Sequence, residues 1–333
     1  MMSNYFLSTT PKTKEEEEEY NFICQQHNQL IKTSPKGNGW RVKTLYNYKG
    51  FWINPNTLKT NLILHSYFKC QPTDIILASF MKSGTTWLKA LMFSTLNRDR
   101  YTFSDHHLLR NGPQSTFPFI DCECYPISDF THLPKPRLFA THFARALLPP
   151  CMTSTCKFVY VCRDPKDVLI SKWHFMKKLR STDLPPLTLE KAFSLFCQGV
   201  SEYGPFWEHV LSYWKASLES PDKILFLKYE EIMKKPEVVV RKLAEFMGKP
   251  FVEDEEEKGV VNEIVKLCSF ENLSNLEVNK NGVEKFGKLV EVEKCQFFRK
   301  GEIGDWKNYL SKEMKECIDG ITHEKLKGSG LVL

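Results

Sequence analysis

The sequence repeats one pattern three times: a short apolar run, a polar loop, and then a stretch with the periodicity of an amphipathic helix. The paired segments are residues 74–80 with 85–96, residues 156–162 with 165–179, and residues 223–229 with 238–248. Parts of these runs, at residues 158–162 and 224–227, are apolar at every position, which is typical of strands buried on both faces. A further run at residues 137–143 indicates one more strand. The pattern predicts an α/β fold with a central parallel β-sheet flanked by helices on both faces.

The length of 333 residues fits one α/β domain with large insertions. We predict a single domain at residues 39–333, preceded at residues 1–38 by a flexible tail and a short helix, with a solvated acidic run from Glu15 to Glu19. The alternating aromatic residues around Lys49-Gly50 predict a hairpin. Residues 279–306 are rich in glycine and charge and lack a clear period, so we expect a lid over the functional site.

The composition excludes several classes of protein. Hydrophobic residues make up 42% of the chain and charged residues 26%, which is ordinary for a globular protein. The net charge of +6 is spread without a dense basic run, so a small anionic ligand fits better than nucleic acid. No window approaches the ~18 apolar residues of a membrane span, and the N-terminus does not resemble a signal peptide. We therefore expect a cytoplasmic protein with no membrane partner.

The cysteines give no sign of a metal site. The chain has 11 of them, an odd number that cannot pair completely, and they show no double CxxC pattern. Cys122 and Cys124 form only a CxC, for which ordinary thiols are a better explanation than metal ligation. We expect free thiols in a reducing compartment and no bound metal.

The segment from Lys82 to Thr86, with Ser83, Gly84 and Thr85 between them, has the layout of a P-loop-like anion site. It lies between a predicted strand and a predicted helix, where unpaired backbone N–H groups and the helix dipole favour an anion. It is not the nucleotide-triphosphatase P-loop, because here lysine precedes glycine instead of following it. Taken alone, the segment could also be an ordinary helix start beside a surface lysine.

Two further groups of cationic residues accompany this loop. Arg163 follows a predicted strand, and Ser171 lies about two turns into the next helix, so a guanidinium and a hydroxyl could both bind a phosphate. Arg299, Lys300 and Gly301 lie in the expected lid. Arg163 alone would more often be a surface ion-pair partner. Three separated groups indicate a ligand with more than one anionic group.

The motifs KSGTTWLKAL, FATHF, CRDPKDVLIS, LKYEE and FFRKGEIGDW, in this order and spacing, resemble those of the cytosolic sulfotransferases. This family uses 3′-phosphoadenosine 5′-phosphosulfate (PAPS) as the sulfuryl donor. The resemblance runs from about residue 39 to the C-terminus. The segments LISKWHF and KLCSFENLSNLEVNKNG resemble the plant branch, whose members act on flavonols, brassinosteroids, hydroxyjasmonates and desulfoglucosinolates. The resemblance implies a sulfotransferase fold and a small hydroxylated acceptor.

The resemblance also implies roles for particular residues. Lys82 to Trp87 would hold the 5′-phosphosulfate, with Trp87 also against the adenine. Arg163 and Ser171 would hold the 3′-phosphate, and the segment Arg299, Lys300 and Gly301 would close over it. Tyr229 and Phe270 match positions that contact the adenine in relatives. Core packing would otherwise be the simpler explanation for Tyr229.

His142 matches the catalytic base of the family. A hydroxyl acceptor must lose its proton as it attacks sulfur, and a neutral histidine can accept that proton near the working pH. An isolated histidine at a strand end would more often be structural. In the implied mechanism the sulfuryl group is transferred in line, and Lys82 with the loop N–H groups stabilises the transferred group and the leaving oxygen. The donor arrives without a bound metal in this family.

Three positions depart from the family pattern. Met81 stands where the family usually has proline, so we expect altered loop rigidity with retained binding. Ala140 stands where many animal members carry a lysine that assists catalysis, and that role is not assigned here. Ser311 and Lys312 replace the Thr-Val pair of the animal dimer motif. We therefore expect a monomer or a weak homodimer.

Two alternatives remain open from the sequence. A kinase-like phosphoryl transferase could use a similar loop, although the Walker pattern is missing. A nucleotide-binding homologue that has lost turnover would be consistent with Met81. The acceptor pocket is expected to draw on aromatic residues, which are 13% of the chain; the candidates are Tyr46, Phe51, Trp52, Phe143 and Phe206. Core packing explains these equally well, and the sequence does not separate the four acceptor types.

Overall fold

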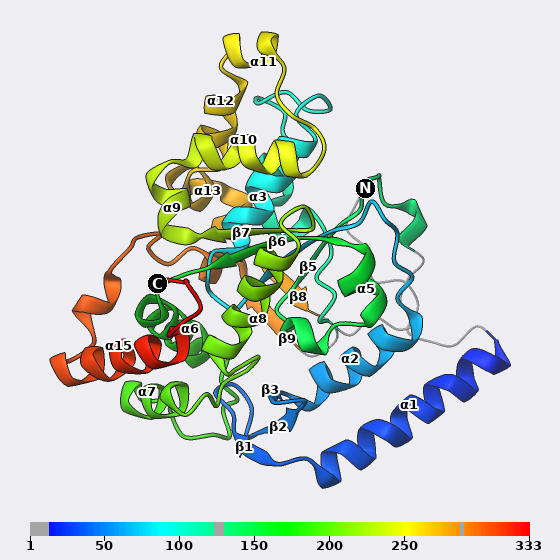
Figure 1. Ribbon diagram of the computed structural model, residues 1–333, viewed down its shortest axis with the longest axis vertical. Coiled ribbons are helices and arrows are strands. Elements are labelled where there is room, and N and C mark those ends of the chain that lie inside the picture. Colours follow the sequence, from blue (N-terminus) through cyan, green and yellow to red (C-terminus); the bar gives the residue numbers. More distant parts are fainter. Residues whose placement is uncertain (1–12, 123–129, 287–289) are drawn as a thin grey trace.

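The computed structural model describes residues 13–122, 130–286 and 290–333. At its centre is a sheet of four parallel strands in the order β5-β4-β6-β7 (Figure 1). The strands are β4 (Ile75–Ser79), β5 (Leu138–Thr141), β6 (Lys157–Cys162) and β7 (Ile224–Lys228). All four lie in the apolar runs that predicted them, and all neighbouring pairs are parallel. The predicted α/β fold is confirmed.

The sheet is buried on both faces because alternate side chains of each strand enter different hydrophobic cores. In β4, Ile76 and Ala78 belong to one core and Ile75 and Leu77 to the other. The first core is completed by α6 (Pro165–Leu179), α8 (Phe206–Glu219) and α15 (Lys312–Leu326). The second is completed by α3 (Thr85–Leu96), α10 (Pro236–Phe246) and α12 (Val260–Leu267).

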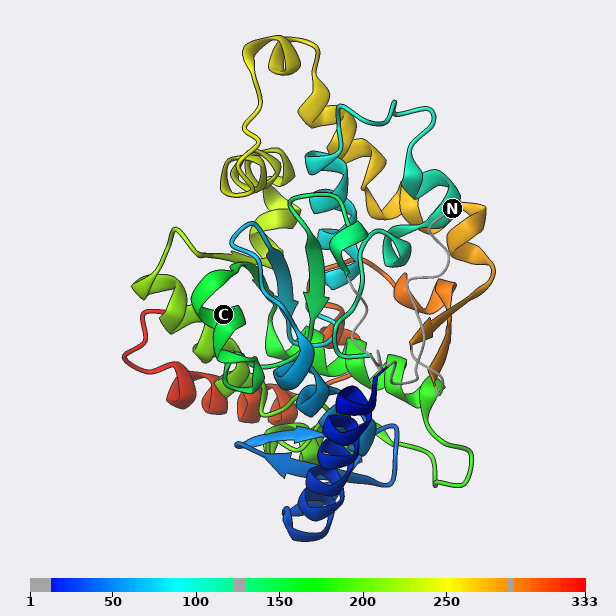
Figure 2. The ribbon, with the colours of Figure 1, turned by 90° about the vertical axis from the view of Figure 1, so that its right-hand side faces the viewer.

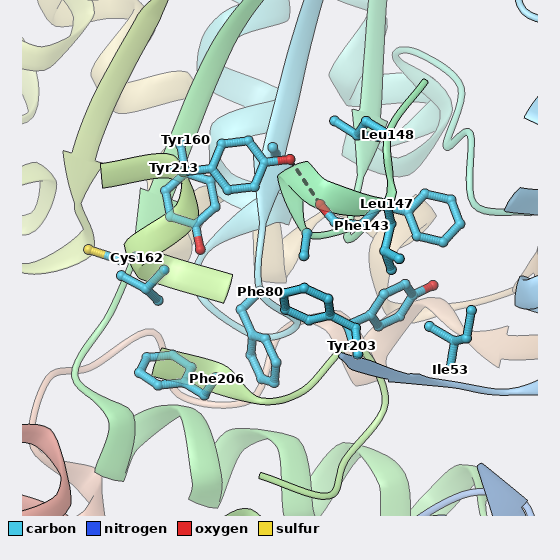
Figure 3. Packing of buried hydrophobic residues seen from close by; sticks show 14 of the residues in the cluster. Ile53, Phe80, Phe143, Leu147, Leu148, Tyr160, Cys162, Tyr203, Phe206 and Tyr213 are labelled. Carbon is cyan, nitrogen blue, oxygen red and sulfur yellow. Dashed lines mark hydrogen bonds between the residues drawn. The ribbon is translucent and has the colours of Figure 1, made fainter. Parts of the chain in front are cut away.

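The first core is rich in aromatic side chains (Figure 3). Tyr160 of β6 stacks on Tyr213 of α8 with ring centroids 4.3 Å apart. The Tyr213 hydroxyl donates a hydrogen bond to the carbonyl oxygen of Phe143, at 2.9 Å. Phe80, directly after β4, meets Phe206 edge to face at 5.2 Å. This packing fixes the segments that follow β4 and β5, and those segments form one wall of the site.

The remaining elements surround this central unit. The helices are α1 (Lys14–Thr33), α2 (Pro55–Tyr67), α4 (His107–Asn111), α5 (Pro150–Thr155), α7 (Leu189–Cys197), α9 (Tyr229–Lys234), α11 (Glu253–Glu257), α13 (Phe270–Asn275) and α14 (Glu277–Lys280). The strands are β1 (Lys36–Asn38), β2 (Thr44–Tyr48), β3 (Phe51–Ile53), β8 (Val283–Phe286) and β9 (Val290–Glu293). Over the described ranges, no helix is long and apolar enough to cross a membrane.

From residue 13 onward, the N-terminal region contains a longer helix than the sequence suggested. Helix α1 has 20 residues and is not the short helix that we expected. Thr13 caps it by accepting a hydrogen bond from the Glu16 N–H, and the acidic run begins in its first turn, where the helix dipole favours negative charge. Its Ile23 packs with Ile63 of α2, so this helix runs along α2 (Figure 1). Residues 1–12 of the predicted tail lie outside the described residues, as does Cys124.

Strands β1, β2 and β3 form a separate antiparallel sheet, which lies below the central sheet in Figure 2. The predicted hairpin is confirmed: β2 and β3 pair directly on either side of Lys49 and Gly50. Both turn residues have positive φ, 50° and 86°, as a two-residue hairpin turn of type I′ requires. Strand β1 pairs with β2, so residues ahead of position 39 also contribute to this sheet.

The segment predicted as an irregular lid contains a second hairpin. Strands β8 and β9 are antiparallel, with Phe286 opposite Val290. Side chains on one face of this hairpin and from the residues after it line a large cavity; they are Phe286, Val290, Val292, Phe297 and Phe298. The segment therefore lies at this cavity, and its strands were not predicted.

Candidate active site

The carboxyl ends of the four parallel strands meet at one edge of the sheet, and a cavity of about 440 Å³ opens there. Each strand is followed by a residue that the sequence singled out: Lys82 after β4, His142 after β5, Arg163 after β6 and Tyr229 after β7. All four line the cavity. Ligands of open parallel sheets bind at this edge, so the topology explains why separate motifs form one site.

The loop between β4 and α3 is a compact anion cradle. Lys82 and Gly84 have positive φ, 69° and 116°, and α3 begins at Thr85, so the first N–H groups of the helix are left without intrahelical partners. A Cβ at Gly84 would lie 2.8 Å from the ring of Tyr229 and at an unfavourable φ. Glycine is therefore required here to bring the backbone this close to the cavity wall.

Lys82 places a cation beside this cradle. Its Nζ lies 4.1 Å from the ring centroid of Phe175 on α6, and within the described residues it has no ion pair with a carboxylate. Burial, followed by the positive charges of Arg299, Arg163 and Lys178, lowers the pKa of Lys82 to about 7. Lys82 is therefore a buried cation repelled by its cationic neighbours, and a bound anion would relieve that repulsion.

Arg163 and Arg299 form the second cationic part of the cavity. The Arg163 guanidinium lies over the ring of Tyr229 at 4.4 Å and is 3.4 Å from Asp167, while one of its amino groups donates to the Glu302 carbonyl oxygen. Arg299 is paired with Asp305. The Nε–H of each arginine is buried without a hydrogen-bond partner among the described residues. Buried donors of this kind call for an acceptor, which a phosphate supplies.

The other predicted donor-site residues are close by. Ser171, on α6, is buried and lines the cavity, as do Thr85, Thr86 and Trp87 from α3. Lys300 lines it too, although its ammonium group donates to Asp305 at 2.6 Å. Ser83 is buried, and its hydroxyl has no hydrogen-bond partner among the described residues, but it is not a cavity-lining residue.

Two aromatic contacts shape the far end of the cavity. Trp87 and Tyr229 meet edge to face with ring centroids 5.6 Å apart. Gly301 has a φ of 67°, and a Cβ there would lie 2.4 Å from the Phe270 ring, so only glycine allows the lid to pack this closely on Phe270. All four residues line the cavity. The three aromatic rings provide flat apolar surfaces suited to a nucleobase.

His142 faces the same cavity in a defined tautomer. Its Nδ1 lies 2.8 Å from the carbonyl oxygen of Ser79, which can only accept, so Nδ1 carries the proton and donates it. Nε2 is therefore the free acceptor. The ring is held between Phe119 and Tyr203, at centroid distances of 4.7 and 5.4 Å. Burial lowers the pKa of His142 to about 3, so the imidazole is neutral at physiological pH.

Asp121 supports His142 and was not predicted from the sequence. It accepts hydrogen bonds from the backbone N–H of His142, at 2.6 Å, and from the hydroxyl of Thr141. Burial raises the pKa of Asp121 to about 7, although these hydrogen bonds act in the opposite direction. From the other side, His209 donates through Nε2 to the His142 carbonyl oxygen at 2.9 Å. No local pattern around residue 121 could have indicated this role.

The prediction of which aromatic residues line the acceptor pocket is wrong. None of the five, Tyr46, Phe51, Trp52, Phe143 and Phe206, lines the cavity. Phe51, Phe143 and Phe206 are buried in the first core instead. Other aromatic residues line the cavity beside those of the predicted donor site, among them Phe119, Phe175, Tyr203, Phe286 and Phe297. Strand alternation and helix rotation decide which rings point into the core, and aromatic content alone carries no such direction.

Residues 80–83 form a turn in which Met81 is the second residue. The Ser83 N–H closes the turn by donating a hydrogen bond to the Phe80 carbonyl oxygen at 3.2 Å. Lys82 at the third position has the positive φ of a type II turn, in which proline is common at the second position. The Met81 N–H makes no hydrogen bond with a described residue. The free energy of unfolding of Met81→Pro is therefore expected to exceed that of Met81→Ala by about 0.4–1 kcal/mol, because proline restricts the unfolded chain.

Urea denaturation of the wild type, Met81→Pro and Met81→Ala would measure this effect. The alanine variant is the control, since it removes the side chain without fixing φ, and it should be no more stable than the wild type. A proline variant less stable than the alanine variant would contradict the assignment of the turn.

Taken together, the anion cradle at a helix start, the two arginines and the neutral histidine line one cavity, which is suited to a ligand with several anionic groups. Residues 72–330 of the chain match a family model described as "Sulfotransferase domain". The chain therefore belongs to the sulfotransferase family, and it is a PAPS-dependent sulfotransferase, as the sequence motifs predicted.

Plant proteins are among the most similar relatives. Cytosolic sulfotransferase 11 of Arabidopsis thaliana is 47% identical over 315 residues, covering 93% of this chain and 89% of the relative. Flavonol 3-sulfotransferase of Flaveria bidentis is 44% identical over 308 residues, covering 91% and 99%. These names agree with the plant branch that the sequence indicated, and the first agrees with the expected cytoplasmic location.

Solved structures agree on the fold. An Arabidopsis thaliana sulphotransferase superposes with a TM-score of 0.73 at 38% identity, covering 98% of this chain and all of the other. A mouse sulfotransferase in complex with PAP superposes with a TM-score of 0.66 at 25% identity, covering 86% and 95%. PAP is 3′-phosphoadenosine 5′-phosphate, the form of PAPS that has lost its sulfuryl group.

Proposed function

We propose that this protein transfers the sulfuryl group of PAPS to a hydroxyl of a small metabolite, of the flavonol, brassinosteroid, hydroxyjasmonate or desulfoglucosinolate type. The observation that carries the proposal is that one cavity contains both a neutral histidine with a free Nε2 and a lysine without a counter-ion. The relative named for flavonol sulfation supports a flavonol among the acceptors to be tested. We expect the reaction to take place in the cytoplasm.

The donor would occupy the half of the cavity that contains the cradle and the lid. Lys82 to Trp87 would bind the 5′-phosphosulfate, and Arg163 and Ser171 the 3′-phosphate. Arg299, Lys300 and Gly301 would close over that phosphate. Tyr229 and Phe270, with Trp87, would contact the adenine. The unpartnered Nε–H groups of both arginines support this arrangement, because the nucleotide phosphates would accept from them.

His142 and Lys82 would divide the chemistry. Bound PAPS supplies an activated sulfuryl group. His142 Nε2 takes the proton of the acceptor hydroxyl while the new O–S bond forms, and the carbonyl oxygen of Ser79 holds the resulting imidazolium through Nδ1–H. Lys82 and the loop N–H groups stabilise the negative charge that builds on the phosphate oxygen as its bond to sulfur breaks. The products are PAP and the sulfated acceptor, and the proposal includes no metal.

Transfer of ³⁵S from labelled PAPS to representatives of the four acceptor types would test this proposal. We expect labelled product with at least one type, and no phosphorylated product when ATP and Mg²⁺ replace PAPS. Tight binding of PAP without transfer to any acceptor would overturn the proposal and favour a binding homologue that has lost turnover. Label transfer from [γ-³²P]ATP would favour a phosphoryl transferase.

The affinity for PAP is expected to fall as pH rises above about 7. The pKa of Lys82 is lowered to about 7 in the empty site, so its ammonium group is present below that pH and is progressively lost above it. Binding of an anion favours the charged form, and binding should therefore take up protons at pH 8. Calorimetric titrations at pH 6, 7 and 8 in buffers of different ionisation enthalpy would measure both effects. Proton release at pH 8 would contradict this prediction.

A further inference from the structure

Two cysteines outside the cavity lie in direct contact. Cys70 follows α2 in the segment that leads to β4, and Cys151 lies in the first turn of α5. Their sulfur atoms are 2.9 Å apart, although the two residues are 81 positions apart in the chain. Cys70 is half-buried, Cys151 is exposed, and neither lines the cavity. The pair is therefore open to small reagents in solution and takes no part in the proposed transfer.

The backbone on either side of Cys70 is fixed. Arg137, directly before β5, forms a buried ion pair with Asp74 at 2.6 Å and donates a hydrogen bond to the Lys69 carbonyl oxygen at 2.9 Å. The N–H of Gln71 donates to the same Asp74 carboxylate at 2.8 Å. Both neighbours of Cys70 are thus held by one buried ion pair, which limits how far Cys70 can move.

Contacts between α2 and the segment before α5 fix the other side of the pair. Asn61 and His65 of α2 both lie within hydrogen-bond distance of the Leu147 carbonyl oxygen, at 2.7 and 3.0 Å. Met152, next to Cys151, is fully buried in the first core. Packing and hydrogen bonds that do not involve sulfur therefore hold the two cysteines against each other. A disulfide bond is about 2.05 Å long, so the two sulfur atoms need to approach by only about 0.9 Å.

A third thiol lies beside the pair but is not accessible to solvent. Cys156, directly after α5, is fully buried and contacts Cys70. That contact, followed by burial, raises the pKa of Cys70, and burial raises the pKa of Cys151 to about 11. The thiolate is the reacting form of a cysteine, so both thiols react slowly at neutral pH. The pair therefore suits slow disulfide formation during sustained oxidation, with the exposed Cys151 as the member that meets a reagent from solution.

We propose that Cys70 and Cys151 form a reversible disulfide when glutathione disulfide accumulates, and that this bond stabilises the fold while leaving the active site unchanged. The Cys151 thiolate attacks one sulfur of glutathione disulfide, which forms a mixed disulfide and releases one glutathione thiolate. The Cys70 thiolate then attacks the sulfur of Cys151 and releases the second glutathione thiolate. Two electrons pass from the cysteine pair to glutathione disulfide, and the two protons lost by the cysteines complete two molecules of reduced glutathione.

The bond would close the part of the chain that contains much of the candidate site. Residues 70–151 include Lys82 of the cradle, the supporting Asp121 and His142. A cross-link that closes a long loop restricts the unfolded chain and stabilises the folded state. In a reducing compartment the thiols would stay free, because disulfides there are rare and transient. The oxidised and reduced forms should therefore differ in stability and not in affinity for PAP.

Peptide mapping of the purified protein after incubation at pH 8 with glutathione disulfide, or with reduced glutathione, tests the proposal. Trypsin releases Cys70 in residues 70–82, and it releases Cys151 and Cys156 together in residues 146–157. Fragmentation of the linked peptides in the mass spectrometer is therefore needed to tell the last two cysteines apart.

Cys70→Ser and Cys151→Ser each remove one member of the pair. Cys295→Ser is the matched control, because Cys295 is also exposed and its sulfur contacts the Glu293 carboxylate. In the oxidised wild type and in oxidised Cys295→Ser we expect peptides linked through Cys70 and Cys151, and dithiothreitol should separate them. Oxidation should raise the melting temperature of the wild type by about 5–10 °C more than that of Cys70→Ser, because only the wild type gains the cross-link.

The Kd for PAP, measured by calorimetric titration, should be equal in the oxidised wild type and in oxidised Cys70→Ser. Unlinked peptides, a link through Cys156, or glutathione that stays attached to Cys151 would overturn the proposed disulfide. An equal change of melting temperature in the wild type and Cys70→Ser, or a loss of PAP affinity found only in the oxidised wild type, would overturn the proposed effect on the protein. None of these measurements depends on an acceptor, so their outcome is independent of the proposed function.

Discussion

Replacing His142 with alanine is expected to lower kcat/KM for sulfate transfer by about 10²- to 10⁴-fold, the usual contribution of a general base. The free Nε2 is the acceptor atom for the hydroxyl proton, and Asp121 and His209 hold the backbone on either side of it. The Kd for PAP should change by less than about threefold, because none of the cationic groups of the donor site is removed.

Single-turnover sulfation with the most active acceptor, together with calorimetric titration of PAP, would separate the two effects. His27→Ala is a suitable control, since His27 is half-buried on α1 and contacts the Pro55 carbonyl oxygen outside the cavity. A His142→Ala variant that keeps more than a tenth of the wild-type rate would contradict the assignment of the base.

The protonation of His142 makes a related prediction about pH. Because burial lowers its pKa to about 3, His142 stays neutral as the pH falls through the ordinary histidine range. Protonation of His142 should therefore not lower kcat/KM between pH 7 and pH 5. A profile of kcat/KM against pH that falls tenfold per unit below pH 6.5 in the wild type, under conditions where the fold is intact, would be inconsistent with this.

The parts of the site that were predictable share a physical origin. A run that is apolar at every position becomes a strand buried on both faces, and parallel strands end at one edge of the sheet. Lys82, His142, Arg163 and Tyr229 each follow such a run, so their convergence is a consequence of topology. The resemblance of the motifs to those of the sulfotransferases then indicated a role for each residue.

Other parts depend on contacts between distant segments, and the sequence carries no local sign of them. Asp121 reaches His142 from a loop, and Glu202 reaches Trp40 and Lys172 from positions far apart in the chain. An isolated glutamate between serine and tyrosine would be read as an exposed residue, since glutamate is rarely buried unless it is paired. Only the tertiary structure shows that pairing.

Replacing Lys82 with methionine is expected to lower kcat by about 10²- to 10³-fold, comparable to the loss of a donor that stabilises developing charge in a transition state. Lys82 lines the same cavity as the start of α3, where the departing phosphate would sit, and none of the described carboxylates forms an ion pair with it. The lysine contacts Phe175, so methionine retains much of the packing of its apolar stem. Affinity for PAP should weaken by a smaller factor, since Arg163 and Arg299 remain.

Lys178→Met is the matched control for the loss of one positive charge. Lys178 is exposed and lies outside the cavity, but its charge still contributes to the lowered pKa of Lys82. Measured Kd values for PAP and single-turnover rates for both variants would divide the effect of Lys82 between binding and catalysis. A loss in Lys82→Met confined to PAP affinity would contradict a role at the leaving oxygen. If Lys82 has that role, the variant should also lose the proton uptake that accompanies PAP binding at pH 8, while Lys178→Met should retain it.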